Sequence, residues 1–161
     1  MIKNRYKFLP LLLLFFFNSL AATESFSSVF CSKMLDVQNG LVRNNVMIDI
    51  DQGSGKIRSV EFNYSKTDYD DIDTLDLSNY FCLPGLIDMH THISEDHYRP
   101  LIDYLTMTQQ EQIAIGRGLV KKTLLAGFTS VRDLGVYIAW TDKLLRDEIN
   151  SGLTNGPRMQ I

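Results

Sequence analysis

Strand and helix patterns alternate through the second half of the chain, and this order constrains the fold more than any other feature of the sequence. Apolar segments typical of strands lie at residues 86–93, 128–131 and 157–161. Helical patterns lie between them, over residues 108–127 and 142–152, the first beginning with a Thr-Gln-Gln-Glu capping box. A strand–helix–strand order predicts parallel strands with helices packed against the sheet, and such strands are normally buried on both faces.

The length of this region predicts that it is part of a larger architecture. A closed (β/α)₈ TIM barrel needs roughly 250 residues, whereas residues 86–161 supply 76. We therefore predict an α/β fold, the first part of a TIM barrel with about three strands, with the barrel incomplete in this chain. Residues 27–82 have strand patterns and glycine-containing turns without helical periodicity, which predicts a small β-sandwich-like domain before the barrel. The pattern at the end of this β region predicts two short strands, at residues 73–76 and 80–83.

The N-terminal residues have the layout of a secretory leader. Residues 1–7 carry three positive charges, residues 8–17 are wholly apolar, and a small-residue Ser-Leu-Ala sequence follows. We predict a signal peptide over 1–21, a β domain over 22–83, barrel residues over 84–161, and a secreted or periplasmic location. An uncleaved membrane anchor is the weaker alternative, because ten apolar residues are fewer than the roughly 20 that a spanning helix needs.

The charge of the chain limits its partners. The sequence has 16 Lys and Arg residues against 19 Asp and Glu, and removal of the leader takes three basic residues and leaves a net charge of −6. Phosphate binding needs a basic surface, so we expect no nucleic-acid partner. We also expect no stable membrane span after the leader is cleaved.

Two cysteines, Cys31 and Cys82, allow two interpretations. An oxidising compartment would let them form a disulfide. We favour the alternative, in which both are small buried apolar residues in strands. Their spacing matches no zinc signature, so we do not place a metal there.

Residues 84–93, PGLIDMHTHI, place three proton-active side chains at alternate positions of an apolar strand. Asp88, His90 and His92 would project from one face, because side chains alternate with a period of two along a strand. Burying such groups is costly unless a partner compensates them. Neutral imidazoles bind zinc and related cations, and Asp88 could either bind the ion or hold a histidine in place. The segment therefore predicts a metal site.

Three motifs in this order resemble one enzyme family. PGLIDMHTH, at residues 84–92, resembles the PGxIDxHxH motif that opens the barrel of the amidohydrolase superfamily. LAGFTSVRDLG, at residues 125–135, resembles the second barrel strand, GxTTVRDxG, of its imidazolonepropionase-like and Xaa-Pro dipeptidase-like members. GPRMQI, at residues 156–161, resembles the start of their third strand. A small β domain before the first motif is also a family feature, so the resemblance spans roughly residues 27–161.

The resemblance implies that His90 and His92 are the first two ligands of a site for one or two Zn²⁺ ions, and that Asp88 has a supporting role. It implies that a bridging carboxylated lysine or glutamate, two more histidines and a proton-transferring aspartate come from later strands. No catalytic residue is therefore expected within this chain. In the family the cations lower the pKa of a bound water and polarise the scissile carbonyl, and the aspartate acts as general base.

The resemblance, together with the N-terminal leader, predicts an exported, zinc-dependent, dipeptidase-like hydrolase of C–N bonds in amides, peptides or cyclic amides. Its substrate would be a small molecule or dipeptide-like compound, and the full-length form could be a homo-oligomer. Five of eight strands are missing, so we expect the chain to be inactive alone. The alternative is a non-catalytic truncated or decayed secreted product that retains some metal binding.

Charged and aromatic residues near these motifs give weaker signals. The loop residues 95–97 would border the mouth of the site, where we favour solvated charges over substrate contacts. The Arg132–Asp133 pair is compatible with a structural ion pair or with a substrate role. We expect Tyr137 and Trp140 to be packing residues.

Overall fold

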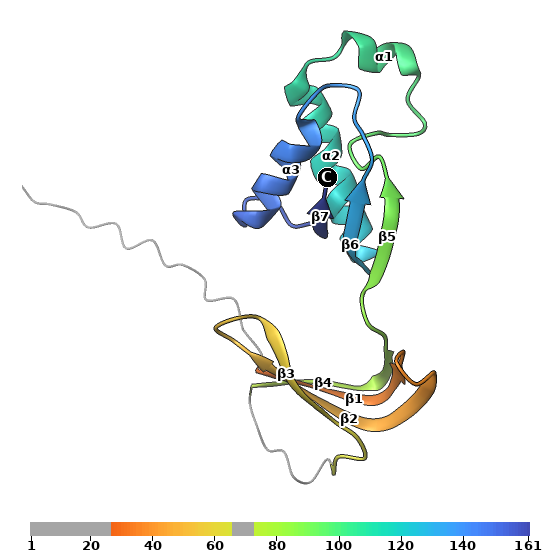
Figure 1. The fold of residues 1–161 in the computed structure, drawn as a ribbon, viewed down its shortest axis with the longest axis vertical. Coiled ribbons are helices and arrows are strands. Elements are labelled where there is room, and N and C mark those ends of the chain that lie inside the picture. The colour runs from red at the N-terminus through yellow and green to blue at the C-terminus, as the bar shows by residue number, and fades with distance from the viewer. Residues whose placement is uncertain (1–26, 66–72) are drawn as a thin grey trace, which may run out of the picture.

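A computed structural model describes residues 27–65 and 73–161 (Figure 1). The chain has a mixed α/β fold with two sheets, one with the strand order β3-β2-β1-β4 and one with the order β5-β6-β7. An extended segment, residues 83–85, joins the two sheets. The predicted signal peptide, residues 1–21, lies outside the described residues.

The N-terminal sheet is built from strands separated by the turns that the sequence predicts. Its strands are β1 (Ser28–Asp36), β2 (Leu41–Asp51), β3 (Lys56–Glu61) and β4 (Thr74–Cys82). β1 pairs with β2 and β2 with β3 in the antiparallel sense. Gly40 and Gly55 adopt a φ of 65° in the two turns, a conformation that glycine adopts without steric cost. β4 then returns to pair in parallel with β1.

β4 is one strand where the sequence predicts two short ones. Its pairing with β1 skips from Leu77 to Phe81, so the residues between them are accommodated as an irregularity within a continuous strand. The prediction of two strands is therefore wrong. The described residues of this region form a single sheet, and the sandwich-like arrangement stays a prediction.

A disulfide joins Cys31 of β1 to Cys82 at the end of β4, with a Cα–Cα distance of 6.1 Å. Cys31 is fully buried. The interpretation favoured from the sequence, two unpaired buried cysteines, is wrong, because the parallel pairing of β1 with β4 brings together residues 51 positions apart. The bond fastens the last strand of this sheet just before the segment that leads to β5.

The second sheet confirms the predicted strand–helix–strand order. Its parallel strands are β5 (Leu86–Thr91), β6 (Phe128–Asp133) and β7 (Arg158–Gln160). Helices α2 (Gln109–Leu125) and α3 (Thr141–Asn150) connect them, and the predicted capping box between Thr108 and Glu111 begins α2. The short helix α1 (Leu101–Thr106) was not predicted, because six residues are too few to show helical periodicity.

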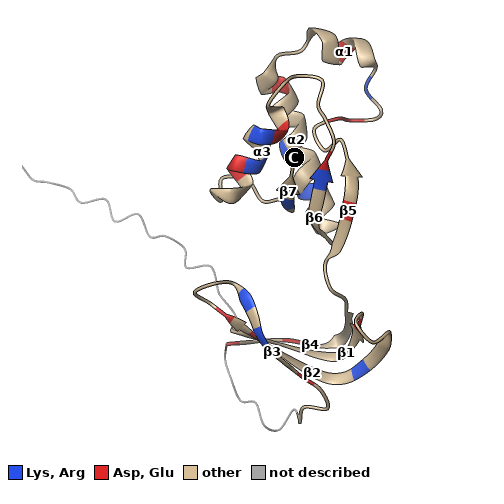
Figure 2. Ribbon diagram, in the orientation of Figure 1, with Lys and Arg blue, Asp and Glu red and all other residues tan. Residues whose placement is uncertain are grey.

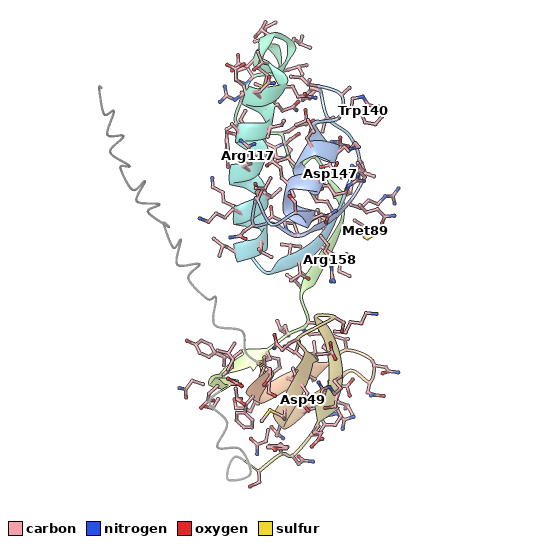
Figure 3. The ribbon with its side chains drawn as sticks, turned by 90° about the vertical axis from the view of Figure 1, so that its left-hand side faces the viewer. Asp49, Met89, Arg117, Trp140, Asp147 and Arg158 are labelled. Carbon is pink, nitrogen blue, oxygen red and sulfur yellow. A yellow bond between two sulfur atoms is a disulfide. The ribbon has the colours of Figure 1, made fainter. Side chains whose placement is uncertain are left out.

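The two long helices cover one face of this sheet (Figure 1). The core between them consists of Ile93, Ile113, Val120, Val131, Leu145 and Met159, with Ile149 packed against it. The opposite face is open: Ile87 is 64% exposed and Met89 is 55% exposed, and Figure 3 shows Met89 directed away from the helices. The expected burial on both faces is therefore wrong for these strands, because the described helices pack on one side.

Charged residues of both signs lie along α3 (Figure 2), and four of them are held in ion pairs. Lys143 and Arg146 both contact Asp147, at 2.6 and 3.0 Å. Arg117 of α2 donates two hydrogen bonds to the carboxylate of Glu148, at 2.8 and 2.6 Å, and this bidentate pair links the two helices. Within residues 27–65 and 73–161, no helix is both long and apolar enough to cross a membrane.

The aromatic residues before α3 differ in their packing. The ring of Tyr137 stacks on that of Tyr104, with centroids 4.9 Å apart, although half of Tyr137 is exposed. Trp140 is 68% exposed and projects from the surface in Figure 3, so the prediction that it packs is wrong. Its backbone has a φ of 69° immediately before α3.

Two glycines of α2 allow a direct test of the helix packing. A Cβ at Gly116 would lie 2.3 Å from Cδ1 of Leu145, a fully buried side chain, whereas a Cβ at Gly118 would meet nothing within 4 Å. We expect Gly116→Ala to destabilise the protein by about 1–3 kcal/mol through overpacking. Gly118→Ala should stabilise it by up to about 1 kcal/mol through helix propensity. Urea unfolding measures both free energies, and equal effects would contradict the packing of α2 on α3.

Candidate metal centre

The two histidines lie at the carboxyl end of β5, where the strand departs from regular pairing with β6. Asp88 pairs with Val131. Thr91, three residues further along β5, pairs with Asp133, which is two residues further along β6. Such a bulge adds one residue to a strand and breaks the alternation of faces. Asp88 therefore lies opposite Val131, a residue of the helix-covered core, and the single face predicted for Asp88 and both histidines stays a prediction.

The rings of His90 and His92 are brought together despite the bulge. Their centroids lie 5.6 Å apart, with an angle of 66° between the planes. Both residues line a pocket of about 510 Å³, and Asp88 lines the same pocket. The structure thus assembles the three residues that the sequence predicts for the site. Because zinc binds imidazole nitrogens at about 2.0–2.1 Å, two rings at this separation can face one cation between them.

Asp88 supports His90 through the backbone. One oxygen of its carboxylate, Oδ1, accepts a hydrogen bond from the backbone N–H of His90, at 3.0 Å. A bulge leaves an extra residue without a ladder partner, and a short acidic side chain two residues earlier can satisfy the N–H group. This hydrogen bond fixes the main chain that carries the first imidazole, and the supporting role of Asp88 at a metal stays a prediction.

His92 is oriented by the segment that follows β6. Its Nδ1 lies 3.0 Å from the backbone oxygen of Gly135. A carbonyl can only accept, so a neutral His92 in this contact carries its proton on Nδ1 and presents an unprotonated Nε2. A metal ligand needs that unprotonated nitrogen, and a carbonyl partner on the other nitrogen is the usual support for a ligating histidine.

Glu95 lies closer to the site than the sequence predicts. The carboxylate oxygen Oε1 is 4.0 Å from Nδ1 of His92, and 13% of the side chain is exposed. Burial raises the pKa of the Glu95 carboxyl, and the charge of His92 partly opposes that effect. The prediction of a solvated loop charge is therefore wrong for Glu95, whereas His97 is exposed as expected. Nothing in the sequence indicated that Glu95, three positions after His92, would fold back toward the imidazole.

Arg132 and Asp133 do not form the ion pair considered from the sequence. Asp133 is 3% exposed, and burial raises the pKa of its carboxyl. Its Oδ2 accepts the backbone N–H of Ile93 at 2.6 Å, and its Oδ1 accepts that of Gly135 at 3.1 Å. Arg132 is exposed and lines the open face of the sheet. Neighbouring residues of a strand point to opposite faces, which separates the two charges.

A buried amide anchors the loops around the site. Gln112 of α2 is fully buried and donates to Oγ of Ser94 at 3.3 Å. Its Oε1 accepts the backbone N–H of Ile138 and the hydroxyl of Thr141, at 3.1 and 3.2 Å. Sequence reasoning missed this residue, because a lone glutamine in a helix carries no motif. The network ties the loop after β5 and the start of α3 to the same helix.

The described residues do not by themselves complete a metal-binding group. Among residues 27–65 and 73–161, no group of three or more His, Cys, Asp or Glu side chains is arranged to hold an ion. Two imidazoles fit the donor preference of zinc, and they leave coordination positions for ligands from elsewhere. The two cysteines are joined to each other in the N-terminal sheet, so they do not belong to the site.

Comparison with known proteins gives one family match. Residues 81–161, half of the chain, match the model of the amidohydrolase family. No curated protein sequence matches the chain.

The similar solved structures include peptidases. A Xaa-Pro dipeptidase with methionine bound in its active site has 28% identity and a TM-score of 0.67, with 82% of this chain and 32% of that chain covered. A prolidase complexed with N-methylphosphonate-L-proline has 25% identity and a TM-score of 0.67, with 82% and 31% covered. The A. niger ochratoxinase has 21% identity and a TM-score of 0.63, with 82% and 30% covered, and supports the fold alone. The chain thus spans about a third of the length of these proteins.

Two glutamates with opposite pKa shifts allow a pH test of the environment of Glu95. Burial raises the pKa of Glu95, whereas the backbone N–H and hydroxyl of Thr108 hold the pKa of Glu111 below its usual value. A raised pKa lets the folded chain bind a proton more tightly than the unfolded chain, so its contribution to stability is lost as pH rises.

As the pH rises from about 4 to about 8, the stability of Glu95→Gln should therefore increase relative to that of the parent protein, and the stability of Glu111→Gln should decrease. Urea unfolding at both pH values measures the change for each variant. A change of the same sign in both would contradict the burial of Glu95.

Proposed function

The chain belongs to the amidohydrolase family, and on this premise we propose that it is the metal-binding opening portion of a hydrolase that cleaves C–N bonds. The observation that carries the proposal is the pair of imidazoles, His90 and His92, at the carboxyl end of the first parallel strand. Active sites of barrel enzymes lie at this end of the strands, where residues of several strands converge.

His90 and His92 would hold a divalent cation, for which zinc fits the nitrogen donors best, and one or two ions are compatible with the pair. The bound metal supplies an activated water and polarises the carbonyl to be cleaved. The chain's own residues prepare the donors: the Gly135 carbonyl keeps the Nε2 atom of His92 unprotonated, and Asp88 fixes the backbone of His90. The carboxylate of Glu95 adds negative charge beside His92, which favours a cation there.

The proposed substrate is a small amide, a dipeptide or an N-acyl amino acid. Support comes from the similar solved structures, which include a Xaa-Pro dipeptidase and a prolidase. The acidic composition of the chain remains a reason to expect no nucleic-acid partner. We further propose that cleavage needs ligands and a proton-transferring aspartate from strands beyond these three, so that the 161 residues alone bind metal without turnover. A homo-oligomer of the complete protein is compatible with this proposal.

Zinc binding by the two histidines can be measured on the chain itself. Isothermal titration with Zn²⁺, and the absorption bands of Co²⁺ as a spectroscopic substitute, should show binding by the parent protein. His90→Ala and His92→Ala should each weaken it more than about tenfold, because each removes one donor. Asp103→Ala is the control and should leave the affinity unchanged, since the exposed Asp103 carboxylate pairs with Arg99 and lies outside the pocket that both histidines line.

The zinc-loaded chain is then assayed against Xaa-Pro dipeptides and N-acyl amino acids. No turnover is expected. Turnover that disappears in His90→Ala would contradict the proposed inactivity of the chain, and equal zinc affinity in the parent and both histidine variants would contradict the proposed site. The alternative, a non-catalytic secreted product, predicts that in-frame coding sequence for further histidines and an aspartate is missing downstream.

We also propose that the chain is exported and that residues 1–21 are removed as a signal peptide. The disulfide between Cys31 and Cys82 supports this, because structural disulfides persist in oxidising compartments. Mass spectrometry of the protein secreted by a host should give a mature N-terminus at Ala22, and retention of the leader would contradict its removal as a signal peptide. Reduction should lower the free energy of unfolding of the N-terminal sheet by about 2–4 kcal/mol. The same reductant should leave the Cys31→Ser/Cys82→Ser double variant unchanged.

A further inference from the structure

A buried carboxylate from β6 holds the main chain on two sides of His92. We propose that Asp133 is a positioning residue that fixes the tautomer and orientation of His92 by holding the Gly135 carbonyl against its Nδ1 atom. This inference rests on the proposed function, because it assigns a role to Asp133 toward a metal-binding imidazole.

The hydrogen bonds form a continuous path from Asp133 to the ring. Oδ2 accepts the N–H of Ile93, the residue after His92, at 2.6 Å. Oδ1 accepts the N–H of Gly135 at 3.1 Å, and the carbonyl of Gly135 lies 3.0 Å from Nδ1 of His92. One carboxylate therefore fixes both the backbone that carries the imidazole and the residue whose oxygen the imidazole contacts.

The backbone around Gly135 is shaped for this contact. Gly135 has a φ of 151°, a conformation that other residues rarely adopt. The preceding residue, Leu134, donates its N–H to the backbone oxygen of Thr91 at 2.9 Å, which joins the loop to the end of β5. The loop thus turns back over the strand that carries the histidines, and the carbonyl of Gly135 is directed at the second of them.

The hydrogen bonds that Asp133 accepts require a carboxylate rather than an amide at this position. Asp133 is 3% exposed, and no lysine or arginine pairs with it in the part of the chain that the structure describes, so burial of its charge is compensated by N–H and O–H donors. An asparagine of the same shape has one acceptor oxygen, and its NH₂ group would meet one of the two N–H donors head-on. The site uses both oxygens as acceptors, which explains why an acid is buried here at the cost of desolvation.

His90 provides an internal comparison. Its ring faces that of His92, and among the described residues no carbonyl or carboxylate holds either of its nitrogens. Loss of Asp133 should therefore change the tautomer of His92 and leave that of His90 nearly unchanged. A purely structural role for Asp133 would affect both rings alike, or neither.

The test is ¹⁵N NMR of the imidazoles in metal-free protein at about pH 8, where ordinary histidines are neutral. In the parent protein His92 should carry its proton on Nδ1. Asp133→Asn should shift the ratio of the two tautomers at least about threefold and weaken zinc binding about 10–100-fold, the usual effect of losing a partner that orients a ligand. Asp103→Asn is the matched control, because the Asp103 carboxylate is exposed and pairs with Arg99. It should change neither the tautomer ratio nor the zinc affinity.

Gly135→Ala reaches the same contact without touching the carboxylate, because alanine disfavours a φ of 151° and displaces the carbonyl. It should shift the His92 tautomer ratio in the same direction. If Asp133→Asn does not fold, the result for Gly135→Ala tests the proposal. The proposal is overturned if parent His92 carries its proton on Nε2, if a folded Asp133→Asn keeps the parent ratio, or if neither variant folds. Parent protein that fails to bind zinc while His92 keeps its Nδ1 proton would refute the proposed function and leave this inference standing.

Discussion

The parallel pairing of β5 with β6 is the constraint on which the candidate site depends. It brings Thr91, the end of β5, beside Asp133, which lies 42 positions further along the chain. α2 makes this possible by crossing the sheet and burying its apolar side against Val131 and Leu145. The site is therefore held by a hydrophobic core that lies beneath it, and its polar contacts are made between backbones that this core has already aligned.

The local patterns of the sequence predicted the elements of this half well. A capping box, a glycine that ends a helix and a short β-branched segment each act within a few residues, so α2 and β6 could be placed from the sequence. The His-x-His spacing also survives folding as a pair of adjacent rings. These features share one property: the physical cause of each lies within the segment itself.

The features that sequence reasoning missed arise between segments. The bulge in β5 depends on its register with β6, and it interrupts the regular pairing between Asp88 and Thr91. The Cys31–Cys82 bond depends on a parallel pairing between strands far apart in the chain. The burial of Glu95 depends on how the loop after β5 is held by Gln112 through Ser94. None of these contacts has a periodic signal, because the partner that creates it lies elsewhere in the sequence.

The acids around His92 carry an electrostatic cost that a cation would reduce. Burial raises the pKa of both Glu95 and Asp133. The charge of Asp133 further raises the pKa of Glu95, whereas the charge of His92 lowers the pKa of both carboxyls. In a folded chain at neutral pH, two desolvated carboxylates near one imidazole therefore oppose folding. A positive ion between His90 and His92 would offset their charge, so metal binding and folding of this end of the sheet would support each other. The open face of the sheet adds no compensating burial here, so a bound ion would stabilise the β5 end more than the helix-covered core.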